Sequence, residues 1–131
     1  MEIRVSRPAI DRLLAEAARA SPKECCGILL GRDRHIEEAK PATNFAADAL
    51  CRFEIDPQAL VDAQRIARHG GPQVLGYYHS HPAGLAVPSA TDRAQAAHDG
   101  AIWAIVGEAD VTFWRDDEAG FAALSYIVDD G

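Results

Sequence analysis

Residues 76–92 read GYYHSHPAGLAVPSATD and place two histidines on either side of a serine, with a second serine and an aspartate further on. The segment QVLGYYHSH, residues 73–81, predicts a strand. Side chains two residues apart project from the same face of a strand, so His79 and His81 can converge on one point. Ser89 opens a predicted helix that carries Asp92 toward the same place. Three protein ligands with an open fourth position are typical of a catalytic zinc ion.

Alternating strands and helices are predicted on both sides of this stretch. Strands are predicted at residues 3–5, 25–31, 35–40, 52–55, 73–81, 101–107, 110–116 and 121–129, with a loop at residues 41–50. Helices are predicted to begin at Ser6, Asp56 and Ser89 and to end before residues 21–24, at Gly70 and at Gly100. This order predicts a mixed sheet with helices packed on it, an α/β or α+β sandwich.

The composition is that of one globular domain spanning residues 1–131. The chain is 48% hydrophobic and 25% charged, which is enough apolar surface for a sizeable core and argues against disorder. Its net charge of -7 does not favour binding to nucleic acid or to an anionic membrane, because both need clustered Lys and Arg. The N-terminal residues contain no apolar run typical of export or membrane insertion, so we expect a cytoplasmic protein.

Three cysteines, Cys25, Cys26 and Cys51, are present. An odd number without an export signal favours reduced thiols over a disulfide framework. Because no Cys-x-x-Cys spacing occurs, we interpret the adjacent pair Cys25 and Cys26 as small buried hydrophobic residues rather than nucleophiles.

Each part of the histidine cluster also has a purely structural interpretation. Ser89 and Asp92 fit the Ser-x-x-Asp pattern of a helix capping box, and a lone histidine on a strand is more often structural than a ligand. Two histidines on one face beside an acidic residue favour a metal site instead. The Ser-x-x-Asp unit can serve both uses, because a helix N-terminus also stabilises an oxyanion.

Hydrolysis by a metal-activated water also needs a proton acceptor. Glu24, between the first helix and the buried strand at residues 25–31, is the best-placed carboxylate. We interpret Glu37, Glu38 and Glu108 as solvated, since each lies on a predicted strand edge or turn with polar neighbours.

Together these positions resemble the JAMM (MPN+) metalloprotease signature, E…H-S/T-H-x7-S-x2-D. Glu24, then His79-Ser80-His81, then the seven residues PAGLAVP, then Ser89 and Asp92 fill it at matching spacing. The similarity spans nearly the whole chain, in the manner of compact bacterial JAMM domains. It implies a cytidine-deaminase-like α/β/α sandwich with a mixed central sheet and about three helices. The H-x-E and P-C-x-x-C elements of zinc deaminases and the HExxH of zincins are missing, which argues against both of those mechanisms.

Carried over position by position, the resemblance implies that His79, His81 and Asp92 bind Zn2+, with water as the fourth ligand. Glu24 would accept the proton of that water and pass it to the leaving amine, while Ser89 would stabilise the tetrahedral oxyanion. Family members hydrolyse peptide or isopeptide bonds after the Gly-Gly tail of ubiquitin or ubiquitin-like proteins, and bacterial ones resemble enzymes that act on sulfur-carrier proteins. We therefore expect a zinc metallopeptidase with such a carrier protein as its substrate. The extended tail of the carrier could add to a sheet edge near the site.

Two other functions stay open. A non-catalytic MPN-type scaffold would only bind partner proteins, although the intact ligand set argues against it. A metal-dependent hydrolase of a small amide would use the same chemistry without a protein substrate. The sequence does not indicate the identity of the carrier, the leaving group or the oligomeric state.

Overall fold

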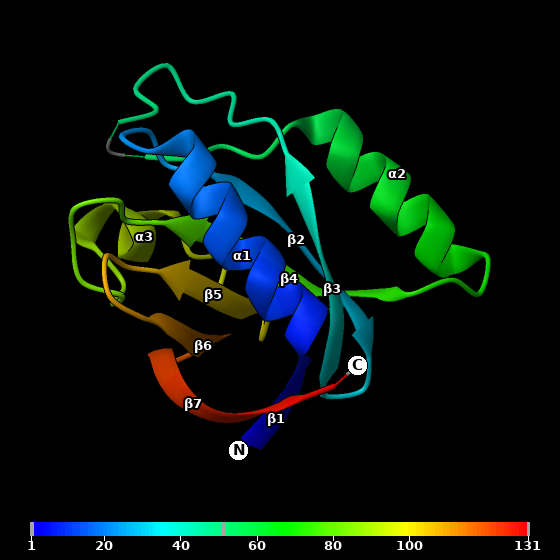
Figure 1. Ribbon diagram of the computed structural model, residues 1–131. Coiled ribbons are helices and arrows are strands. Elements are labelled where there is room, and N and C mark those ends of the chain that lie inside the picture. The colour runs from blue at the N-terminus through cyan, green and yellow to red at the C-terminus, as the bar shows by residue number, and fades with distance from the viewer. Residues whose placement is uncertain (1, 51, 131) are drawn as a thin grey trace.

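The computed structural model describes residues 2–50 and 52–130, which contain three helices and seven strands (Figure 1). In chain order these are β1 (Glu2–Ser6), α1 (Arg7–Ala20), β2 (Cys26–Arg32), β3 (His35–Ala42), α2 (Pro57–Arg68), β4 (Gln73–Ser80), α3 (Ala90–Gln95), β5 (Ile102–Val106), β6 (Val111–Asp117) and β7 (Gly120–Asp129). The predicted class, helices packed on a mixed sheet, is confirmed.

The sheet has the strand order β1-β3-β2-β4-β5-β6-β7 and closes on itself, because β1 pairs in parallel with both β3 and β7. The β4–β5 pair is also parallel, and the remaining pairs are antiparallel. Each of these seven strands therefore has two neighbours. Closing the sheet leaves little free edge, although β1 pairs only with His35 and Ile36 of β3, and the addition of a substrate tail to a sheet edge stays a prediction.

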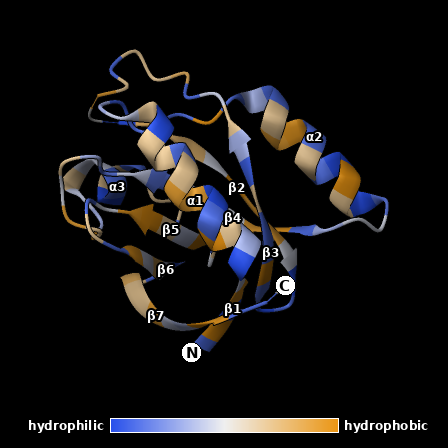
Figure 2. Cartoon of the chain, in the orientation of Figure 1, coloured by the Kyte–Doolittle hydropathy of each residue, from blue (hydrophilic) through white to orange (hydrophobic). Residues whose placement is uncertain are grey.

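The main core lies between α1 and the concave side of the sheet. Ser6 caps α1, its Oγ accepting the Ala9 N–H at 3.2 Å, and a proline follows in the first turn, as predicted. The helix buries Ile10 and Leu13 among apolar side chains from the strands. All of β5 is buried, in agreement with its largely apolar colouring in Figure 2.

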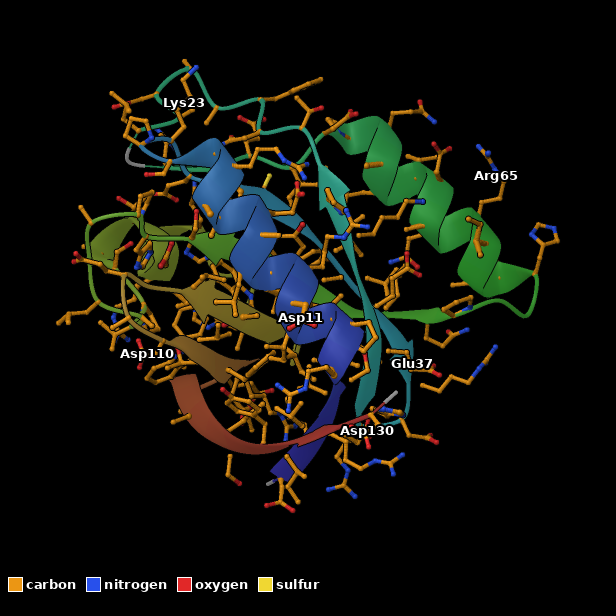
Figure 3. All side chains as sticks on the ribbon, viewed as in Figure 1. Asp11, Lys23, Glu37, Arg65, Asp110 and Asp130 are labelled. Carbon is orange, nitrogen blue, oxygen red and sulfur yellow. The ribbon has the colours of Figure 1, made fainter. Side chains whose placement is uncertain are left out.

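The second helix, α2, covers the opposite face of the sheet. Side chains alternate between the two faces of a strand. Accordingly, Leu29 of β2 belongs to the α1 core, whereas its neighbours Ile28 and Leu30 pack against Ala63 of α2. The predicted Asp56 cap of α2 is confirmed, with Asp56 Oδ1 accepting the Gln58 N–H at 2.9 Å. Helices on both faces give the α/β/α layers (Figure 1), and the charged side chains labelled in Figure 3 are all exposed.

The third helix is shorter than predicted. It ends at Gln95 rather than near Gly100, and the next residue, Ala96, has extended backbone angles of φ -65° and ψ 133°. The buried Asp116 explains the early end. Its carboxylate accepts the His98 N–H at 3.0 Å and its carbonyl accepts the Gly100 N–H at 2.7 Å, which draws residues 96–100 away from a helical path.

Two smaller features complete the fold. The predicted strand at residues 52–55 is wrong, because only a single bridge, Asn44 to Ile55, forms there. Cys25 and Cys26 are free and buried, as predicted, and burial raises the pKa of the Cys26 thiol to about 12. Cys51 lies outside the described residues. In the described part of the chain, no helix is long and apolar enough to cross a membrane.

Candidate metal centre

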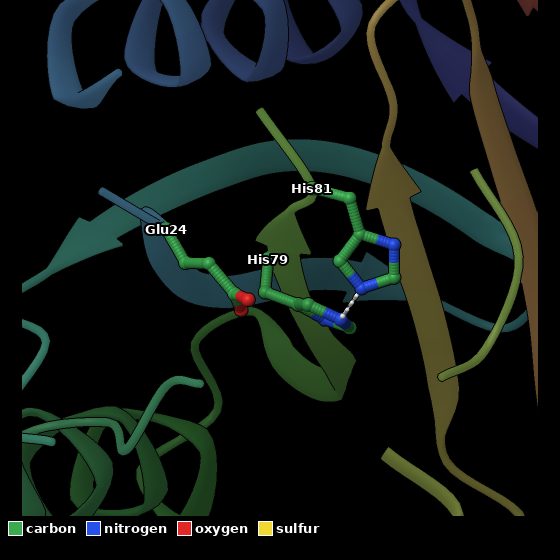
Figure 4. Close-up of side chains that lie close together, drawn as sticks. All are labelled: Glu24, His79 and His81. Carbon is green, nitrogen blue, oxygen red and sulfur yellow. Dashed lines mark hydrogen bonds between the residues drawn. The ribbon is translucent and has the colours of Figure 1, made fainter. Parts of the chain in front are cut away.

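The two histidines of the opening motif meet at the end of β4. The paired neighbours β2 and β5 fix this strand end, and Gly76 allows close pairing, since a Cβ there would overlap the backbone carbonyl of Ile102. His79 is fully buried and His81 is half-buried at the surface. Their Nε2 atoms lie 3.1 Å apart (Figure 4). The two imidazoles thus present one nitrogen each to a common point.

Asp92 reaches the same point from the first turn of α3. Its Oδ2 lies 3.1 Å from His79 Nε2 and 3.3 Å from His81 Nε2. The same oxygen accepts the Ser89 N–H at 2.9 Å, while Ser89 Oγ accepts the Asp92 N–H at 3.0 Å. The capping box is therefore complete, and it orients the carboxylate toward the imidazoles. The structural and functional interpretations of Ser-x-x-Asp do not exclude each other.

Neighbouring groups fix the two imidazole rings. His81 Nδ1 lies 2.9 Å from the Leu85 carbonyl, a contact that requires Nδ1 to carry a proton and leaves Nε2 as the ring atom that faces Asp92. The His79 ring is stacked on Phe53, with centroids 4.3 Å apart and an interplanar angle of 16°, and Trp103 contacts it edge-on. His79 is held by aromatic packing, and its buried Nδ1 has no hydrogen-bond partner among the described residues.

The charges at this point favour a cation. Burial alone would raise the pKa of Asp92, but hydrogen bonds from His79 and His81 outweigh it and hold that pKa well below its usual range. Burial lowers the pKa of His79 and keeps its ring neutral, whereas the Asp92 hydrogen bond raises the pKa of His81. An ionised carboxylate beside two imidazole nitrogens is a donor set that suits zinc.

Glu24 completes the cluster from the irregular segment before β2. A carboxylate oxygen of Glu24 and one ring nitrogen each of His79 and His81 lie within 4.8 Å of one another, a candidate metal site in itself (Figure 4). Glu24 is only 7% exposed, and burial raises its pKa to about 7, an effect that His81 partly offsets and that Asp92 and Asp48 reinforce. Such a carboxyl group can take up or release a proton near neutral pH.

The family of prokaryotic homologs of the JAB domain matches residues 6–117. The chain belongs to this family. The most similar relatives include a desampylase of Haloferax volcanii, 35% identical over 92% of this JAB chain and 92% of its own length. A probable TtuB-protein conjugate cleaving protease of Thermus thermophilus is 36% identical over 70% of the JAB chain, which spans 62% of that relative.

Solved structures agree with the JAB assignment. A solution structure of a protein from Desulfitobacterium hafniense has a TM-score of 0.88 and 28% identity, and covers 100% of this chain and 94% of its own. A JAB1/MPN domain protein from Archaeoglobus fulgidus has a TM-score of 0.61 at 20% identity, over 95% of this chain and 99% of its own. The JAB/MPN fold, which is cytidine-deaminase-like, is therefore confirmed.

A cleft of about 480 Å³ separates the β3–α2 loop from α3 in this JAB domain. One wall is the loop between β3 and α2, with Asp48 and Arg52, and the other is α3, with Thr91 and Gln95. The first wall is next to Glu24, whose pKa responds to the charge of Asp48, and the second carries Asp92.

Three residues that contact the site residues of this JAB domain were not predicted from the sequence. Phe53 stacks on His79, Ser80 Oγ accepts the Cys25 N–H at 2.9 Å, and Asn44 Nδ2 donates to the Glu24 carbonyl at 3.0 Å. Only Ser80 carried a signal, its place between the two histidines. The contacts of Phe53 and Asn44 depend on a loop whose path no periodicity predicts.

Proposed function

We propose that this JAB-family chain is a zinc-dependent metallopeptidase that cleaves after the C-terminal Gly-Gly of a ubiquitin-like or sulfur-carrier protein. The observation that carries the proposal is the triangle of His79 Nε2, His81 Nε2 and Asp92 Oδ2, with sides of 3.1, 3.1 and 3.3 Å. Tetrahedral ligands about 2.0–2.1 Å from a zinc ion lie roughly 3.3 Å from one another. We therefore assign zinc to these three side chains, and leave Glu24 as the base.

Glu24 moves the proton in this proposal. A zinc ion bound here would lower the pKa of a water molecule to about 7 and polarise the scissile carbonyl. The Glu24 carboxylate accepts one proton from the attacking water as its oxygen bonds to the carbonyl carbon. Glu24 then donates that proton to the amine as the C–N bond breaks, so the carboxylate is regenerated. A positioned acid/base of this kind contributes about 100- to 10,000-fold to the rate.

Ser89 stabilises the tetrahedral oxyanion. Its Oγ accepts the Asp92 N–H of the capping box, so its own hydroxyl proton is left to donate. The donor is oriented before substrate arrives, which is the condition for effective electrostatic stabilisation.

The substrate class rests on the relatives and on the surface around the cleft. The Haloferax relative is a desampylase, and the Thermus relative is a probable TtuB-protein conjugate cleaving protease. Exposed apolar side chains flank the metal centre: Phe45 and Leu50 on the β3–α2 loop, and Leu85 and Val87 on the β4–α3 loop. Exposed apolar groups around a site are typical of protein docking. A glycine tail carries no side chain, so its backbone can approach the buried site closely.

Cleavage of carrier fusions tests the proposal. The full chain, loaded with zinc, is incubated with carrier proteins whose Gly-Gly tail is fused to a short extension, with and without chelator. We expect a product that ends at the second glycine, no product with chelator, and a rate lowered by about 100- to 10,000-fold with Glu24→Gln. Cleavage of small amides alone would favour the small-amide hydrolase, and a purified protein without zinc or turnover would favour the scaffold. We also propose a cytoplasmic location.

A further inference from the structure

The dipeptide Glu24-Cys25 lies between α1 and β2, outside regular secondary structure. All four of its backbone polar groups are nevertheless hydrogen-bonded. The Glu24 N–H donates to the Ala49 carbonyl at 2.7 Å, and the Cys25 carbonyl accepts the Ser80 N–H at 3.2 Å. Side chains satisfy the other two. Asn44 Nδ2 donates to the Glu24 carbonyl at 3.0 Å, and Ser80 Oγ accepts the Cys25 N–H at 2.9 Å.

Asn44 uses the whole hydrogen-bonding capacity of its amide. Nδ2 donates to the Arg52 carbonyl at 3.1 Å as well as to Glu24, and Oδ1 accepts the N–H groups of Ala46 at 3.0 Å and Glu54 at 2.9 Å. A side-chain amide has two donors and two lone pairs, so none is left over. Asn44 thus joins both arms of the loop beside the cleft to the backbone of Glu24.

Ser80 makes the matching connection on the other side. It is fully buried, and it lies between His79 and His81 on the strand end that presents the imidazoles. Its backbone and hydroxyl both bond to Cys25, the residue next to Glu24. The distance between the glutamate backbone and the histidine pair is therefore fixed by a side chain as well as by the sheet.

We propose that Asn44 and Ser80 are positioning residues that hold the Glu24 carboxylate at its working place beside the imidazole pair. The catalytic part of this inference rests on the proposed function. A base must lie within hydrogen-bond reach of the proton that it accepts, and a displacement of about 1 Å can cost roughly 100-fold in rate. Glu24 lies outside regular secondary structure, so the two side chains add to the constraint from the two backbone hydrogen bonds and from β2, which begins at Cys26.

Four single substitutions compare the two residues with controls that make the same chemical change away from the site. Asn44→Asp keeps an acceptor for Ala46 and Glu54 but turns the donor into an oxygen that faces two carbonyls. Gln73→Glu is its control, because Gln73 Nε2 also donates to two carbonyls, those of Ala67 and Gly71, at the far end of β4. Ser80→Ala removes the hydroxyl, and Ser125→Ala on the exposed face of β7 is its control.

We expect Asn44→Asp and Ser80→Ala to lower kcat by about 10- to 100-fold while KM and the bound zinc stay at wild-type values. The two controls should cleave at the wild-type rate, and Ser80→Thr, which restores a hydroxyl, should recover most of the loss. Adding Asn44→Asp to Glu24→Gln should cost nothing further, because the residue acts through Glu24. A general structural role would instead lower the residual rate of that double variant. An unchanged kcat in both single variants would overturn the inference.

Amide hydrogen exchange of the metal-free full chain tests the contacts without turnover. The Cys25 N–H should exchange slowly in the wild type and in Ser125→Ala, and faster in Ser80→Ala. Rapid exchange of Cys25 in the wild type would overturn the inference even if Asn44→Asp fails to fold. A wild type that cleaves no carrier while the Cys25 N–H exchanges slowly would refute the proposed function. The hydrogen bonds that hold the Glu24-Cys25 backbone would still be supported.

Discussion

The ring of Phe53 lies nearly parallel to the imidazole of His79, with 4.3 Å between the ring centroids. Phe53 comes from the loop between β3 and α2, whereas His79 comes from the end of β4. A buried metal-ligating histidine usually has its second nitrogen held by a hydrogen bond. Among the described residues, His79 Nδ1 has no such partner, and the stacked ring of Phe53 restrains the imidazole instead. The loop that borders the cleft therefore also orients a candidate ligand.

This stacking predicts that Phe53→Leu weakens zinc binding. Leucine keeps an apolar side chain in the pocket but leaves the imidazole free to rotate, and lost support of a ligand typically costs about 10- to 100-fold in metal affinity. Competition with a chromogenic chelator measures the change. Phe121→Leu is the control, because Phe121 packs on Trp103 and has no ring contact with His79. Equal zinc affinities for the two variants would contradict a role for the stacked ring.

Asp92→Asn separates the capping role of this residue from its proposed metal role. The amide oxygen can still accept the Ser89 N–H, so α3 should form, but the negative charge beside the imidazoles is lost. We expect zinc affinity to fall by more than about 100-fold, beyond the usual effect of a supporting residue. Asp56→Asn makes the same change at the cap of α2, away from the metal centre, and should bind zinc normally. Isothermal titration of both variants provides the comparison.

Ser89→Ala is expected to affect both stability and turnover. Losing the N-cap costs about 1 kcal/mol of unfolding free energy, and losing an oxyanion donor costs roughly 100- to 1,000-fold in kcat. Ser6→Ala removes the cap of α1 and the bond that Ser6 Oγ donates to the Glu37 carbonyl, so it should lower stability at least as much without that loss of kcat. Denaturant melts and cleavage rates measured on both variants distinguish the two effects. A Ser89→Ala protein that is less stable but fully active would leave this serine with a capping role alone.

The raised pKa of Glu24 predicts how Glu24→Gln changes stability with pH in the metal-free protein. Burial lifts that pKa from 4.5 to about 7. Between these values the folded chain keeps a proton that the unfolded chain releases, so stability falls as pH rises through this window. Glutamine stays neutral and avoids the loss. We expect equal stabilities near pH 4 and an advantage for the variant of the order of 1–3 kcal/mol near pH 8. A difference that does not change with pH would contradict a buried, proton-holding Glu24.

The sequence was informative where local rules decide structure. Period-two spacing brought His79 and His81 together, and capping preferences placed the starts of all three helices. Errors arose where distant residues compete with local preference. Asp116 ends α3 early through bonds to His98 and Gly100, and closure of the sheet depends on β1 pairing with strands far along the chain. Phe53 and Asn44 gain their contacts in the same non-local way.

A crystal structure of the zinc-loaded protein tests the central claim most directly, because two overlapping sets of side chains compete for the ion. Glu24 with the two histidines forms one set, and Asp92 with the same histidines forms the tighter one. The account predicts one zinc ion about 2.0–2.2 Å from His79 Nε2, His81 Nε2 and a carboxylate oxygen of Asp92, with Glu24 outside bonding distance. Zinc bound through Glu24 in place of Asp92, or no zinc between the histidines, would contradict it.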